Sequence, residues 1–86
     1  IYNMKVLDNI SWKQLGDRVV AVDTNSGDYF TFNDVASTIW LAINENKTID
    51  EIVALIIDDY DISDAEKVRQ DIDNQLAQWK EMSLMA

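Results

Sequence analysis

Residues 27–40 read GDYFTFNDVASTIW, and within them a strand pattern changes directly into a helical pattern. Phe30 and Phe32 alternate with the polar Thr31, as in a strand that buries one of its faces. An Asn or Asp at the change of pattern is a preferred helix N-cap. From Asn33 onward apolar residues recur at helical spacing: Val35, Ala36, Ile39, Trp40 and Ile43. The stretch predicts a short strand that leads straight into a capped amphipathic helix.

The residues before this junction predict two further strands. The three expected strands span residues 8–15, 18–23 and 28–32, with a turn at Gly16 and Asp17 between the first two. Residues 24–27 read TNSG, and Asn and Gly tolerate the positive φ that tight hairpin turns require. We therefore expect a three-stranded antiparallel sheet, with Trp12 covering its outer face.

The buried face of the second strand depends on the length of the TNSG loop. With an even number of loop residues, Val19 and Ala21 share a face with Phe30. With an odd number and a bulge, Val20 and Val22 take that place instead. We expect the odd loop, because it puts more apolar area on the buried face.

Three helices follow the sheet. The first begins at an Asn33 or Asp34 cap and ends near residue 44. The second opens with TIDE at residues 48–51, a capping box in which the Thr hydroxyl and the Glu carboxylate satisfy free backbone N–H groups. The third opens with SDAE at residues 63–66, which predicts a second capping box, and ends near residue 82. The expected fold is α+β, a three-stranded antiparallel sheet followed by a three-helix bundle.

No Pro, repeat or low-complexity linker interrupts the chain, so we expect one domain over residues 4–86. Residues 1–3 precede Met4 and are interpreted as a candidate tag or fusion remnant. The 86 residues include no Cys and no His, which excludes thiolate and imidazole metal sites, Cys–His nucleophiles and Ser–His–Asp triads. The dispersed carboxylates form no calcium-loop motif. We expect no enzyme activity, no metal and no cofactor.

The net charge is −9, from 16 acidic and 7 basic residues. Such a field repels phosphate backbones and anionic lipid surfaces, so we expect neither nucleic acid nor membrane as a partner. No apolar run approaches the ~20 residues that a membrane span needs. A cytoplasmic location is the expectation.

The order of elements and several short stretches resemble the PqqD-like family of RiPP recognition elements. These are winged helix-turn-helix-like domains that bind the leader segment of a ribosomally made precursor peptide. The size and stand-alone form are most similar to the leader-binding proteins of lasso peptide biosynthesis. Two departures stand out: Phe32 and Ser83 replace a frequent family Leu and Gly. The matching stretches are residues 20–23, Gly27, residues 29–33, 39–40, 48–53 and 71–72, and Leu76.

The resemblance implies that a leader adds to the third strand as a further strand, in a groove beside the third helix. Phe30 and Phe32 would form its floor, and Asp28 and Asp71 would meet basic leader residues. A leader protease and a cyclase of the same pathway are the implied enzyme partners. The implied leader-binding residues are Asp28, Tyr29, Phe30, Thr31, Phe32, Val68, Asp71, Ile72, Gln75 and Trp79.

Three alternatives stay open from the sequence. A peptide chaperone for another modified peptide, such as a quinone-cofactor precursor, fits the same family. An acidic adaptor that docks on an enzyme fits the charge. A winged helix-turn-helix suggests DNA binding, but the acidic helices disfavour it. A short precursor-like reading frame beside this gene would distinguish leader binding from the adaptor.

Overall fold

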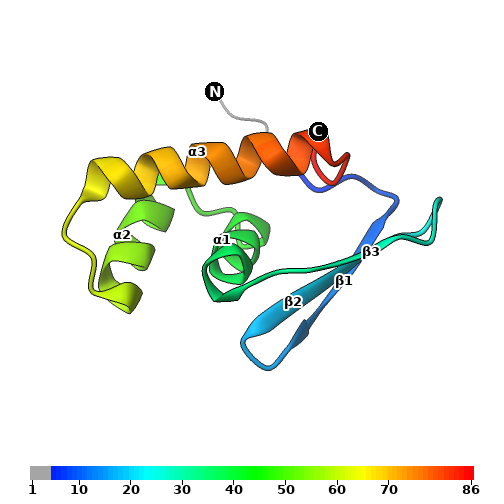
Figure 1. Ribbon diagram of the computed structural model, residues 1–86, viewed down its shortest axis with the longest axis horizontal. Helices are drawn as coiled ribbons and strands as arrows, with labels where there is room; N and C mark the ends of the chain where they lie inside the picture. Colours follow the sequence, from blue (N-terminus) through cyan, green and yellow to red (C-terminus); the bar gives the residue numbers. More distant parts are fainter. Residues whose placement is uncertain (1–4) are drawn as a thin grey trace.

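The computed structural model describes residues 5–86 and shows three antiparallel strands followed by three helices (Figure 1). The expected α+β fold is confirmed. The interpretation of residues 1–3 as a tag remnant concerns residues outside the described ones. The elements are β1 (Ile10–Leu15), β2 (Arg18–Asp23), β3 (Tyr29–Thr31), α1 (Asp34–Asn44), α2 (Ile49–Tyr60) and α3 (Ala65–Glu81).

The long α3 helix lies across α1 and α2 and reaches toward the sheet with its C-terminal end (Figure 1). The strand order is β1-β2-β3, so β2 is central and β3 is an edge strand. One apolar core fills the space between the inner face of the sheet and the helices. Its most deeply buried large side chains come from the strand β2, all three helices and the segment after α3: Val19, Trp40, Ile52, Ile72, Leu76, Trp79 and Leu84.

The β2–β3 loop has an even number of residues, so the expectation of an odd loop was wrong. Val22 pairs with Tyr29, and the Asp23 N–H donates to the Asp28 carbonyl at 2.8 Å. Residues 24–27 remain as the loop. Val19 and Ala21 are therefore the fully buried residues of β2, on the face of Phe30.

Hydrogen bonds made by Asp23 explain why the loop forms without a bulge. The Asp23 carboxylate accepts from Asn9 Nδ2 and from the Asn25 N–H, both at 2.9 Å. Both bonds lower the pKa of Asp23, and the bond from Asn9 has the larger effect. Gly27 takes a left-handed φ of 81° and donates its N–H to the Asp23 carbonyl. Asp23 therefore binds both the start of the loop, at Asn25, and its end, at Gly27, so the loop closes without an extra residue.

Trp12 lies on the inner face of the sheet, and its expected position on the outer face was wrong. The register pairs Trp12 with Ala21, whose small side chain leaves room for an indole beside it. The Trp12 ring meets the Trp40 ring edge-on, with centroids 6.3 Å apart. Trp12 is therefore a partly buried border of the core.

Two of the three expected helix starts are confirmed. The Asn33 side chain accepts from the Ala36 N–H at 2.8 Å, and Thr48 and Glu51 form the complete capping box. The third helix begins one residue later than the second predicted box requires. Asp64, not Ser63, is its N-cap and accepts from the Lys67 N–H at 3.1 Å. A carboxylate at this position also interacts favourably with the helix dipole.

Ser83 ends α3 in the left-handed conformation, with a φ of 61°. Its N–H donates to Lys80, and the Leu84 N–H donates to Trp79 at 2.9 Å, which together make a Schellman motif. The fully buried Leu84 then accepts from the Leu7 N–H at 3.1 Å. The family Gly that Ser83 replaces would occupy the position that requires positive φ.

We predict that Ser83→Gly stabilises the protein, because Gly adopts positive φ without a Cβ clash. The expected gain in the free energy of unfolding is about 0.5–1 kcal/mol, after part is lost to the more flexible unfolded chain. Urea denaturation would measure it. Ser63→Gly is the matched control, since Ser63 has no left-handed φ, and it should give no gain. Equal effects of the two variants would contradict the assignment of strain to Ser83.

Candidate functional site

The outer edge of β3 has unpaired backbone groups. Hydrogen-bonded pairs alternate along an antiparallel ladder. The pairs that face β2 include Val19–Phe32 and Ala21–Phe30, because the Phe32 N–H donates to the Val19 carbonyl at 3.0 Å. The N–H and C=O groups of Tyr29 and Thr31 therefore point away from β2. Among residues 5–86 no strand lies on that side.

The α3 helix faces this edge and is held near it by aromatic packing. Trp79 is 1% exposed, and its ring centroid lies 5.2 Å from that of Phe32 and 5.1 Å from that of Trp40. The Phe32 and Trp40 rings are also in contact, at 5.1 Å. These three rings join the end of β3, α1 and α3 at one point.

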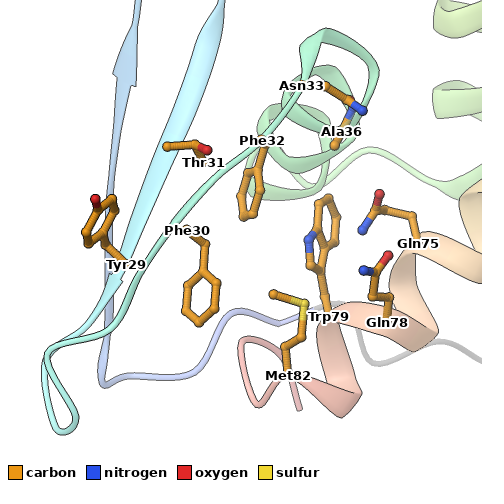
Figure 2. A pocket seen from close by; sticks show the side chains of 10 residues that line it. All are labelled: Tyr29, Phe30, Thr31, Phe32, Asn33, Ala36, Gln75, Gln78, Trp79 and Met82. Atoms are coloured by element: carbon orange, nitrogen blue, oxygen red, sulfur yellow. The ribbon is translucent and has the colours of Figure 1, made fainter.

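A groove of about 440 Å³ lies between β3 and the C-terminal half of α3. Figure 2 shows Phe30 and Phe32, at the end of β3, on one side of the groove. Trp79 of α3 and its C-cap residue Met82 lie on the other side, with Gln75 and Gln78 nearby. No charged side chain lines the groove, although the protein carries a net charge of −9. The lining residues are Tyr29, Phe30, Thr31, Phe32, Asn33, Ala36, Gln75, Gln78, Trp79 and Met82.

Six of the ten residues predicted for leader binding line this groove: Tyr29, Phe30, Thr31, Phe32, Gln75 and Trp79. Asp28 lies just before β3, where its carboxylate accepts from the Ser26 hydroxyl at 3.2 Å. Asp71 is on the surface of α3, paired with Lys67 at 2.5 Å. Val68 and Ile72 are buried, at 3% and 1% exposure. Val68, Asp71 and Ile72 border a different depression, at the N-terminal half of α3.

Four groove residues were missed by the sequence reasoning: Asn33, Ala36, Gln78 and Met82. Gln78 and Met82 follow Gln75 at helical spacings of three and seven residues, so they share its flank of α3. This spacing is readable in the sequence. The spacing alone does not say which flank of α3 faces β3, and the structure supplies that information.

The buried Ser37 hydroxyl holds the end of β3 against β2. Ser37 Oγ accepts from the Val19 N–H at 2.9 Å and lies 3.4 Å from the Phe32 carbonyl, to which it donates. The Phe32 N–H bonds the Val19 carbonyl directly, whereas the Ser37 hydroxyl bridges the other two groups of this pair, the Val19 N–H and the Phe32 carbonyl. The hydroxyl joins the first turn of α1 to the strand that carries the groove.

The described residues show no other chemistry at this site. Within residues 5–86, no group of three or more Asp, Glu, His or Cys side chains is placed to hold a metal ion. None of the helices in that range has both the length and the apolar character of a membrane span. The groove can therefore bind a ligand through hydrogen bonds, apolar contacts and a complementary shape.

Comparison with known proteins identifies the family. Residues 18–84 match the model of the family described as coenzyme PQQ synthesis protein D, PqqD. The chain belongs to the PqqD family. The resemblance stated from the sequence is thereby confirmed. No curated protein sequence matches this PqqD-family chain significantly.

Two solved structures share the fold of this PqqD-family chain. TbiB1 in complex with the TbiA(beta) leader peptide is 30% identical, with a TM-score of 0.86, over 94% of this chain and 93% of TbiB1. A lasso peptide synthetase B1 complexed with the leader peptide is 21% identical, with a TM-score of 0.87, over 95% of each chain. The second likeness shows the fold alone.

We predict that Ser37→Ala lowers the free energy of unfolding by about 1–3 kcal/mol, because it leaves the buried Val19 N–H without its acceptor. Hydrogen exchange should speed up at the Val19 amide. Ser11→Ala is the control, since Ser11 is exposed on β1, and it should change stability by less than about 0.5 kcal/mol. An unchanged stability and a protected Val19 amide in Ser37→Ala would show that Phe32 accepts this N–H directly.

Proposed function

We propose that this protein binds the leader segment of a ribosomally synthesised precursor peptide and delivers it to processing enzymes. The leader adds to β3 as a fourth strand and lies in the groove beside α3. The observation that carries the proposal is the free edge of Tyr29 and Thr31 next to an uncharged, partly apolar groove. The 30% identical TbiB1, whose structure contains a leader peptide, supports it.

The energetics require both the ladder and the groove. Burying two apolar leader side chains against Phe30 and Trp79 contributes roughly 3–5 kcal/mol. Ordering a disordered segment costs on the order of 2–5 kcal/mol. Backbone hydrogen bonds to Tyr29 and Thr31 must therefore add to the net affinity. Because these bonds are independent of sequence, the side-chain contacts supply the specificity.

The leader residues in the groove should be uncharged, since its lining offers no counter-charge. Asp28 lies beside the start of β3, so a Lys or Arg of the leader fits at that end. An exposed pair of this kind contributes only about 0–1 kcal/mol. We therefore assign Asp28 to positioning and the aromatic floor to affinity.

We further propose that residues 4–86 act as a single non-catalytic module for a lasso peptide pathway, with its leader protease and cyclase as enzyme partners. The proposal is supported by the lack of Cys and His in the chain and by the two structural relatives. A chaperone for a quinone-cofactor precursor is the second candidate. The description of the matching family favours it. A precursor gene found beside the gene for this chain would distinguish the two by its sequence.

We predict that Thr31→Pro abolishes leader binding or weakens it at least tenfold. Proline removes the N–H that Thr31 directs to the free edge, while the bonds of β3 to β2 come from its neighbours. Isothermal titration calorimetry with a synthetic leader peptide of the cognate precursor would measure the affinity. In the wild-type protein, amides of residues 28–32 should gain exchange protection.

Two variants control this experiment. Thr31→Ala keeps the N–H and should bind almost as the wild type does. Gln14→Pro makes the same change at the opposite edge of the sheet, where the β1 ladder directs the Gln14 N–H away from β2. A folded Thr31→Pro variant with full leader affinity would rule out strand addition to β3.

We also predict that the purified chain alone neither cleaves nor modifies the precursor. Its described residues hold no nucleophile–base pair with His or Cys and no metal cluster. Mass spectrometry of the precursor after incubation would test this. Product that increases in proportion to protein concentration, in a preparation free of pathway enzymes, would contradict it.

A further inference from the structure

A second, smaller depression lies where α1, α2, the α2–α3 loop and the N-terminal half of α3 meet. Its volume is about 110 Å³. That is less than the roughly 150 Å³ of an apolar cavity that accommodates benzene, so the space suits one branched aliphatic side chain. Six of its seven lining residues are aliphatic, and the seventh is an aspartate: Val35, Ile39, Ile56, Ile62, Val68, Asp71 and Ile72.

The depression has a buried floor and a partly exposed rim. Ile39, Ile56 and Ile72 are at most 2% exposed, whereas Val35 and Ile62 at the rim are each 37% exposed. Water in such a space finds few hydrogen-bonding partners, so an aliphatic group gains by displacing it. Covering the two rim side chains would complete the apolar surface.

The depression continues the groove along α3. Gln75 lines the groove, and Asp71 and Ile72 line the depression one helical turn away. On α1, Ala36 faces the groove while its neighbour Val35 faces the depression. A peptide that leaves β3 at its Asn33 end and follows α3 toward its N-terminus passes from one to the other.

We propose that this depression is a second subsite for the same leader, which takes one Leu, Ile or Val side chain. This inference rests on the proposed function and extends it. The two sites are about seven residues apart on α3, or roughly 10 Å, which an extended peptide covers in about three residues. The aliphatic anchor therefore lies three to five residues beyond the segment paired with β3.

Asp71 defines the chemistry of the residues between the two anchors. Its carboxylate lines the depression at the end nearest the groove and is paired with Lys67. An acidic leader residue here would be repelled by Asp71. The leader therefore combines an uncharged strand segment with a neutral or basic connection and one aliphatic anchor.

The test compares rim variants with a matched control in leader binding. The probe is a synthetic leader peptide of the cognate precursor, the same peptide that tests the proposed function. Ile62→Asp and Val35→Asp place a charge at the rim, and an Asp in the first turn of α1 suits the helix dipole. Leu15→Asp makes the same change at a residue that is 54% exposed on β1, outside both sites.

Each rim variant should weaken leader binding about tenfold, and Leu15→Asp less than twofold. A leader truncated to its strand-pairing segment should bind the wild type and the rim variants equally. Isoleucine methyl NMR supplies a direct readout. The Ile39 and Ile62 methyl signals should shift with the full leader and not with the truncated one.

Three results would overturn the subsite. One is unchanged affinity in both rim variants while amides of β3 still gain protection, which leaves the proposed function standing. Another is a concentration-dependent shift of the Ile62 methyl signal without peptide, which would show that a second copy covers the depression. The third is absence of any β3 protection in the wild type, which removes the proposed function and the subsite together.

Discussion

The contact between Phe32 and Trp79 is the constraint on which the site depends. Backbone hydrogen bonds join β3 to β2, but α3 contacts the end of β3 through the tilted rings of Phe32 and Trp79. Trp40 closes the triangle from α1, so the three rings set the separation of the two groove walls. A ring is rigid and large, and its replacement by a smaller side chain would let α3 approach the strand. The same three rings therefore determine both the packing of the core and the width of the groove.

The β3 edge that we propose as the peptide site is also a hazard for aggregation, because unpaired strand groups attract any extended chain. This protein limits the hazard in two ways. Its β3 strand has only three residues, Tyr29–Thr31, and the Ser37 hydroxyl joins its end to α1. The net charge of −9 keeps copies of the chain apart. A short edge gives few backbone bonds, and so binding must depend on the side-chain groove.

Features determined by neighbouring residues were predictable from the sequence. The Asn33 cap, the Thr48 box and the extent of β2 all follow from local hydrogen-bonding chemistry, and the structure reproduces them. Features that depend on distant contacts were not. The face of β2 followed from how Asp23 closes its loop, and the position of Trp12 followed from a cross-strand Ala. The buried residues of α3, Val68, Ile72, Leu76 and Trp79, recur at helical spacing, but such spacing could not show that Gln78 and Met82 face β3.

The distribution of charge separates two tasks. The acidic surface acts over a distance comparable to the Debye length, about 8–10 Å, and attracts any leader with a net positive charge. The groove has no charged side chain, so under the proposed function it would distinguish leaders by apolar fit and by hydrogen bonds to Gln75 and Gln78. Long-range attraction mainly raises the association rate, whereas buried contacts slow dissociation. The proposed function therefore assigns selectivity among leaders of similar charge to the aromatic floor and the α3 wall, where a mismatched side chain would leave apolar surface uncovered.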